Sequence, residues 1–172
     1  MEIRGIGKIV RPHELEPSKF YMQAALYGQD RPAMFLCFST GKMIDDTPET
    51  QALYFNFNDE TDMIVSSLPD HDLLIEIPDV VIRIDRQSIN GTSRTMGLRP
   101  GMMIAYDGGC AAMVSTGEFR GAYLIDIPRA KLIQEGRPDN WVSFTRWQII
   151  IDEKTEGEAV IASFDAVKPA TN

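Results

Sequence analysis

Leu53-Tyr54-Phe55-Asn56-Phe57-Asn58 carries the clearest structural signal in this chain. In an extended strand, Leu53, Phe55 and Phe57 would point to one face, and the more polar side chains between them would point to the other. A helix would spread the same residues around its axis, because its side chains repeat about every 3.6 residues. The pattern therefore predicts a half-buried β-strand with one solvated face.

The same period of two recurs along most of the chain and predicts further strands. They cover residues 3–10, 20–27, 33–39, 61–65, 73–77, 80–85, 102–106, 111–115, 122–127, 141–151 and 159–164. The segment 141–151 should be the longest of them. Both of its faces carry apolar side chains, so we expect it at the centre of a sheet or in a subunit interface.

Turn residues separate these segments, and helix signals are few. Asp107-Gly108-Gly109 is the strongest hairpin prediction, because glycine adopts the positive φ of a tight turn without a steric clash. A turn or two of helix is predicted within 47–52, where a threonine cap precedes a proline, and another short helix within 129–135.

These signals together predict an all-β fold. We expect a single-domain barrel or sandwich of roughly nine to eleven mostly antiparallel strands, with one or two short helices. The domain should span residues 1–167, and residues 168–172 should form a frayed C-terminal tail.

The tripeptide Ser-Thr-Gly occurs twice, each time after an apolar run. Phe38-Ser39-Thr40-Gly41-Lys42 and Val114-Ser115-Thr116-Gly117-Glu118 each follow an apolar run. Two such turns can mark a duplicated half. Chance explains the repeat better from the sequence alone, because serine, threonine and glycine are common after strands.

The composition excludes two broad classes of protein. Of the 172 residues, 44% are hydrophobic, which is too many for a disordered chain. The 25 Asp and Glu residues outnumber the 17 Lys and Arg residues, for a net charge of −8. This balance argues against a general binder of nucleic-acid backbones, since such proteins carry a basic face.

The acidity is concentrated in residues 43–85, which carry 11 acidic side chains and a single basic one, Arg83. A solvated acidic rim that maintains solubility is one interpretation. The other is an interaction patch that docks a basic partner protein. Its members would be Asp59, Glu60, Asp62, Asp70 and Asp72.

An arginine-rich segment follows the acidic one. Arg83, Arg86, Arg94 and Arg99 fall close together, with Ser88 and Asn90 between them. Guanidinium groups pair well with phosphates, and hydroxyl and amide groups complete such sites. The segment is therefore a candidate receptor for a phosphorylated small ligand or single-stranded nucleic acid, or else a solvated loop whose arginines offset the preceding acids.

Histidine offers a third, weaker hypothesis. His13 and His71 each have acidic neighbours, and His71 lies between Asp70 and Asp72. A metal-assisted hydrolase would use such residues as ligands, but neither histidine has a ligand spacing of its own. We therefore predict no metal and no cofactor.

Other catalytic signals are weak. There is no Gly-x-Ser-x-Gly nucleophile elbow and no phosphate-binding glycine loop. Cys37 and Cys110 lie in apolar runs and are expected to be buried thiols of a reducing compartment. The chain has no apolar N-terminal leader and no stretch long enough to span a membrane, so we expect a cytoplasmic protein without a membrane partner.

Two short segments resemble known families, and we assign neither. Asp85-Arg86-Gln87-Ser88-Ile89-Asn90-Gly91 resembles the Asp-x-Ser-x-x-Gly turn of the PilZ cyclic-dinucleotide receptors, a family of small barrels. It has one residue too many before Ser88 and lacks the family's upstream Arg-x-x-x-Arg. The segment 6–15 resembles the opening strand of bacterial single-strand DNA-binding proteins, whose barrels need a basic groove with stacking aromatics.

The sequence thus favours a non-catalytic binding or interaction domain. We expect it to assemble with itself or to dock a basic partner through residues 43–85. A phosphorylated ligand bound by Arg86, Arg94 and Arg99 is the alternative, a metal-assisted hydrolase is a third possibility, and nucleic acid is the least expected partner.

Overall fold

Fifteen strands in two sheets make up the computed structural model, so the all-β prediction is confirmed. The structure describes residues 7–23, 33–44, 47–55, 63–69, 74–92, 98–115, 122–133, 139–153 and 157–166. The predicted tail at 168–172 lies outside these ranges. No helix within them is long and apolar enough to cross a membrane.

The strands are numbered in chain order. They are β1 (Ile9–Val10), β2 (Phe20–Gln23), β3 (Ala33–Ile44), β4 (Thr47–Phe55), β5 (Met63–Ser66), β6 (Leu74–Ile77), β7 (Val80–Ile84), β8 (Ile89–Thr92), β9 (Met103–Tyr106), β10 (Gly109–Ser115), β11 (Ala122–Asp126), β12 (Lys131–Ile133), β13 (Trp141–Phe144), β14 (Arg146–Glu153) and β15 (Gly157–Asp165). Two 3₁₀ turns, η1 (Pro12–Glu14) and η2 (Arg86–Ser88), are the described helical elements.

Several sequence predictions about individual elements were wrong. The strand expected at 53–58 has no solvated face in its described part, because Tyr54 is 5% exposed and packs in a second core cluster, while residues 56–58 lie outside the described ranges. The strand expected at 141–151 is two strands, because the chain passes at Thr145 from the large sheet to the small one. This break, together with β8 and β12, which the sequence did not predict as strands, raises the strand number to fifteen. The helix expected at 47–52 is part of β4, and the described residues of the helix expected at 129–135 form a turn followed by β12. Pairing of β4 with β3, and of β12 with β11, overrides the local cap and turn signals.

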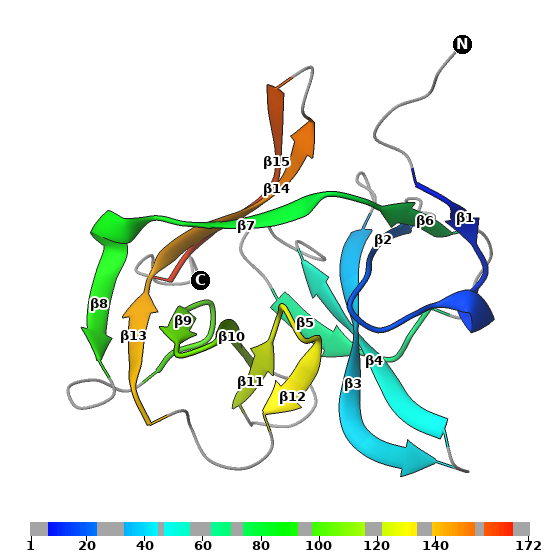
Figure 1. The fold of residues 1–172 in the computed structure, drawn as a ribbon, viewed down its shortest axis with the longest axis horizontal. Helices are drawn as coiled ribbons and strands as arrows, with labels where there is room; N and C mark the ends of the chain where they lie inside the picture. The colour runs from blue at the N-terminus through cyan, green and yellow to red at the C-terminus, as the bar shows by residue number, and fades with distance from the viewer. Residues whose placement is uncertain are drawn as a thin grey trace, which may run out of the picture.

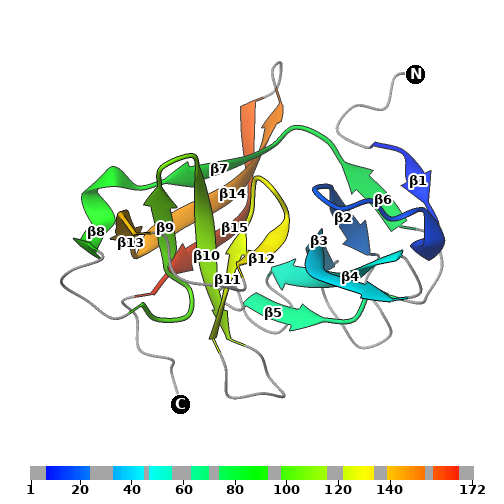
Figure 2. The ribbon, with the colours of Figure 1, turned by 60° about the horizontal axis from the view of Figure 1, so that its bottom comes forward.

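The large sheet contains a closed ring of six strands. In order around the ring these are β3, β4, β5, β10, β11 and β12, as Figures 1 and 2 show from two directions. Two contacts in the ring are parallel, namely Ser115 with Ile64 and Lys131 with Ser39. The small sheet, β15-β14-β7, covers the ring, and both sheets share one core cluster in a sandwich-like arrangement.

The strand registers reveal an internal two-fold relation that the fold class alone does not require. Strands β1 to β7 correspond in chain order to β8 to β14, and every pairing within one set has its counterpart in the other. The relation places Ser39 on Ser115 and Ile64 on Lys131, the four residues of the two parallel contacts. The repeated Ser-Thr-Gly sequence thus begins at equivalent positions, which favours duplication over chance.

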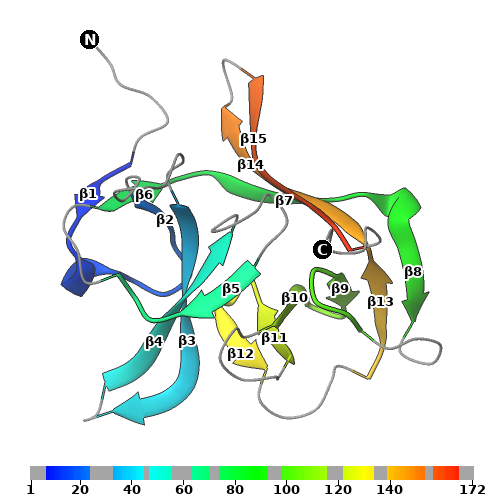
Figure 3. The same ribbon diagram turned by 180° about the vertical axis from the view of Figure 1, so that it is seen from behind.

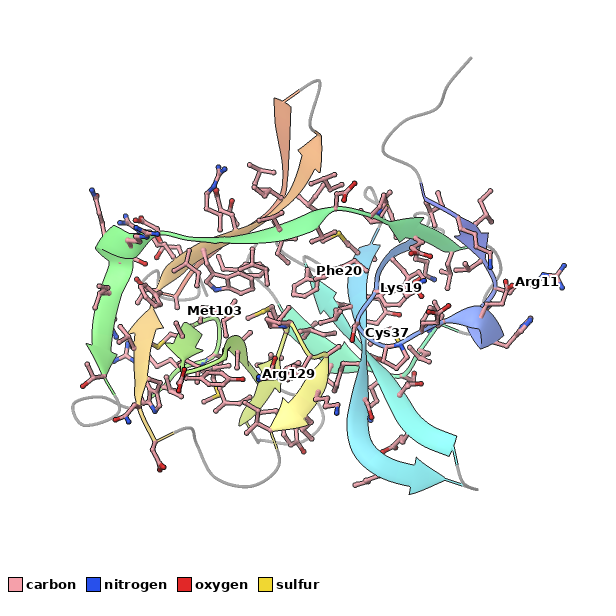
Figure 4. The ribbon with its side chains drawn as sticks, viewed as in Figure 1. Arg11, Lys19, Phe20, Cys37, Met103 and Arg129 are labelled. Atoms are coloured by element: carbon pink, nitrogen blue, oxygen red, sulfur yellow. The ribbon has the colours of Figure 1, made fainter. Side chains whose placement is uncertain are left out.

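The core confirms this correspondence side chain by side chain. The equivalent pairs within the shared cluster are Met34 with Cys110, Leu36 with Ala112, Phe38 with Val114, Leu53 with Ile125, Phe55 with Ile127, Met63 with Ala130, and Val65 with Leu132. Phe20 on β2 and Met103 on β9, both labelled in Figure 4, are a further pair that packs into this cluster. A smaller cluster covers the outer face of each half.

The two halves meet in the small sheet, where β7 pairs antiparallel with β14. The pairing is centred on Ile82 and Ile149, with Val80 opposite Ile151 and Ile84 opposite Trp147. The two-fold relation maps the central contact onto itself and exchanges the two flanking contacts. Strand β15 follows the second half and has no counterpart among the described strands of the first half, and Figure 3 shows it beside β14 from the opposite side.

Candidate functional site

The described arginines of the arginine-rich segment lie on three different parts of the chain. Arg83 lies on β7 and Arg86 in the adjoining η2, and both side chains are exposed. Arg99 is also exposed, but it begins a separate turn that leads to Met102. Arg94 lies outside the described residues.

Ser88, a predicted ligand residue, lies at the junction between the two sheets. It is buried, and its hydroxyl lies 2.7 Å from the Asp85 carbonyl oxygen and accepts from the Arg146 backbone N–H at 3.0 Å. The Asp85 carboxylate pairs with the Arg146 guanidinium at 2.8 Å and accepts from the Gln87 backbone N–H at 2.9 Å. The Ser88 hydroxyl is thus engaged by the protein, and Asn90 is half-buried on β8.

Most of the other predicted site residues fall outside the described ranges. These are Asp59, Glu60, Asp62, Asp70, His71 and Asp72. His13 is exposed on η1. Within the described residues, no group of three or more His, Cys, Asp or Glu side chains is placed to hold a metal ion.

A buried carboxylate that the sequence interpretation missed lies at the end of β11. Asp126 is 4% exposed and accepts from the Tyr106 hydroxyl, from the Arg129 backbone N–H at 2.9 Å and from the Arg129 guanidinium at 2.8 Å. Figure 4 shows Arg129 beside β11 and β12. The Asp-x-x-Arg spacing across a turn was the available signal, but nothing local indicated that Tyr106 would reach it from β9.

This cluster ties two hairpins together. A Cβ atom added to Gly109 would lie 3.1 Å from the Tyr106 hydroxyl oxygen and 3.3 Å from an Arg129 guanidinium nitrogen, so the hairpin packs closely on both side chains. Burial and the bond to Asp126 raise the pKa of Tyr106 to about 12. The phenol is therefore neutral at physiological pH and acts as a fixed hydrogen-bond donor.

Neither thiol is activated for chemistry. Burial raises the pKa of Cys37 to about 11, and burial together with the nearby Asp126 charge raises that of Cys110 to about 11. Since the thiolate is the nucleophile, both side chains are inert at neutral pH.

The exposed large hydrophobic side chains follow a pattern. Ile9 on β1 is 56% exposed, Val81 on β7 41%, Ile89 on β8 61% and Val160 on β15 52%. These are the four strands at which the two described sheets end. Tyr123, on the ring strand β11, is the remaining large hydrophobic residue of this kind in the described ranges.

Comparisons with known proteins give no match. No family model fits the chain, and no curated protein or solved structure matches it.

Proposed function

We propose that this chain is a non-catalytic interaction module that associates with further copies of itself through open sheet edges. The observation that carries the proposal is the exposed aliphatic side chain on each of the four edge strands. An edge strand presents unpaired backbone N–H and C=O groups, which form a template for another strand. Proteins that avoid such pairing commonly place lysine or proline there instead.

The state of the reactive groups is in keeping with a binding role. Cys37 and Cys110 have raised pKa values, and the Asp126 carboxylate is held by three donors. A nucleophile or general base needs an accessible group whose pKa is matched to its task. None of these three groups meets that need.

The earlier alternatives have less support. A phosphate receptor would rely on Arg83, Arg86 and Arg99, of which the last lies in a separate turn, while the Ser88 hydroxyl is already engaged. Docking of a basic partner would rely on acidic residues outside the described ranges. Both stay predictions from the sequence.

Sedimentation velocity on the purified chain tests the proposal. We expect wild-type protein to sediment above the 19.3 kDa of one chain as its concentration rises. A variant with Ile9→Lys, Val81→Lys, Ile89→Lys and Val160→Lys should sediment as a monomer, because lysine at an edge opposes strand pairing. Tyr123→Lys is the control, since that residue is 38% exposed but lies within the ring. A wild-type chain that is monomeric at every concentration contradicts the proposal.

A further inference from the structure

The two equivalent strands of the small sheet, β7 and β14, differ in their number of neighbours. Strand β14 has β7 on one side and β15 on the other, whereas β7 has β14 alone among the described strands. Because β7 and β14 are equivalent, the open edge of β7 corresponds to the edge of β14 that β15 covers.

Backbone hydrogen bonds show which groups face this edge. The Asp85 N–H donates to the Arg146 carbonyl at 3.1 Å, which fixes the alternation along the β7–β14 ladder. The backbone groups of Val80, Ile82 and Ile84 therefore point away from β14. On β14, the Ala166 N–H donates to the Thr145 carbonyl at 2.9 Å. By the same alternation, the backbone N–H and C=O groups of Trp147 and Ile149 point toward β15.

The core side chains of β14 are also more deeply buried than their equivalents on β7. Trp147 is 1% exposed and Ile149 is 0% exposed, and Phe164 of β15 stacks on Trp147 with ring centroids 4.1 Å apart. Their equivalents on β7, Val80 and Ile82, pack against the same core cluster but are only half-buried. Among the described strands, none gives the core below β7 the cover that β15 gives to the core below β14.

We infer that the open edge of β7 pairs antiparallel with β7 of a second copy of this chain, centred on Ile82. This inference rests on the proposed self-association and names the strand responsible. The result is a continuous six-stranded sheet with a two-fold axis at the centre of the new pairing, which is the closed isologous arrangement of most homodimers.

The sequence of β7 is self-complementary in this register. Ile82 lies opposite Ile82 of the second copy and Val80 lies opposite Ile84, so β-branched side chains meet on the core side. On the outer face, Val81 lies opposite Arg83, and no two like charges oppose each other within the strand. The backbone N–H and C=O groups of Val80, Ile82 and Ile84, which point away from β14, would form the hydrogen bonds between the two copies.

The flanking charges are compatible with the register. Asp79 precedes the strand and would lie opposite Asp85 of the second copy. The Asp85 carboxylate is already paired with Arg146 at 2.8 Å, so this contact does not oppose two free charges.

Two substitutions of opposite charge at Val81 test the register by sedimentation velocity. Val81→Lys places a lysine opposite Arg83 of the second copy at two symmetric positions, and we expect loss of the dimer. Val81→Glu places a carboxylate opposite the same arginine, and we expect the dimer to persist. Val160→Lys, the matched change on the outer face of the other edge strand, should leave the dimer intact.

Disulfide trapping gives a second measurement. Residues 81 and 83 would be non-hydrogen-bonded neighbours across the new pairing, at the Cα separation of about 4.5 Å that permits a disulfide. The double variant Val81→Cys with Arg83→Cys should form a covalent dimer on oxidation, whereas neither single variant should. The native thiols, one buried and one half-buried, have pKa values of about 11 and contribute little background.

The outcomes separate this inference from the proposed function. Association that survives Val81→Lys but is lost in the four-lysine variant overturns the β7 pairing and leaves self-association standing through another edge. Loss of the dimer in both Val81→Lys and Val81→Glu overturns the stated register. A wild-type chain that never associates overturns both proposals and leaves the β7 edge to another segment of this chain or to a partner peptide.

Discussion

The carboxylate of Asp126 illustrates how a single residue is stabilised in this fold. It is almost completely buried, yet three donors from two side chains and one backbone group surround it. Hydrogen bonds to a charged group contribute more to stability than neutral ones, and a buried group left unsatisfied is costly. The Tyr106 hydroxyl is the donor that comes from a different hairpin.

Replacing Tyr106 with phenylalanine tests that contact. The change removes the hydroxyl and leaves the ring, so we expect the free energy of unfolding to fall by about 1–3 kcal/mol. Urea denaturation with a fitted midpoint and slope measures it. Tyr123→Phe is the matched control, because that side chain is exposed, and should be nearly neutral. Equal effects in the two variants would show that the Asp126 contact is not stabilising.

At the scale of elements, equivalent strands have different surroundings. Ile82 and Ile149 face each other at the centre of the β7–β14 pairing, and both contact the main core. Strand β15 covers only the side of Ile149. Two residues of the same type at related positions should therefore differ in their contribution to stability.

Alanine substitution at both positions measures that difference. Ile149→Ala should destabilise the chain by about 2–5 kcal/mol, because it leaves a cavity in a fully packed site. Ile82→Ala should cost about half as much or less, when measured at concentrations where the chain is monomeric. Urea unfolding of the two variants decides the point, and a larger cost at Ile82 would contradict the burial pattern.

Local signals at this scale were only partly informative. Alternation correctly placed strands such as β2 and β7, and Asp107-Gly108 correctly predicted the β9–β10 hairpin, in which Tyr106 pairs with Gly109. The helix predictions failed because cap residues describe only the local chain, whereas β4 pairs along its length with β3. The break at Thr145 could not be predicted, because a continuous apolar pattern carries no information about which sheet each part joins.

At the scale of the whole molecule, the free energy of unfolding should fall as the pH becomes alkaline. Burial raises the pKa of Cys37 and Cys110 from 9.0 to about 11, and burial with the Asp126 bond raises that of Tyr106 from 10.0 to about 12. The folded state thus favours the neutral forms of all three groups. Their contribution is complete below the unfolded pKa values and is lost as pH rises through the folded ones.

We therefore expect the urea midpoint to be constant up to about pH 8 and to fall between about pH 9 and 12. The double variant Cys37→Ala with Cys110→Ala should begin its decline about one pH unit higher, because Tyr106 then accounts for more of the loss. An identical pH profile in the double variant would show that the thiols ionise equally in the folded and unfolded chains.

The two-fold relation is the largest feature at this scale. It joins β1–β7 to β8–β14, aligns seven pairs of core residues in the ring and places both parallel contacts at matching positions. A single Ser-Thr-Gly repeat was its only trace in the sequence. Core positions such as Leu36 and Ala112 preserve apolar character but differ in size, since a core tolerates hydrophobic substitution when its total volume and pattern are kept.

The amino-acid sequence by itself determined the all-β class, most strand positions and the inert character expected of the two cysteines, because alternation, turn chemistry and apolar context act over a few neighbouring residues. Only the tertiary structure decided the ring closure, the internal two-fold relation, the burial of Asp126 and the open edge of β7. Each of these depends on which distant strands pair. Strand pairing is set by the packing of whole faces against a common core, and short-range patterns do not encode it.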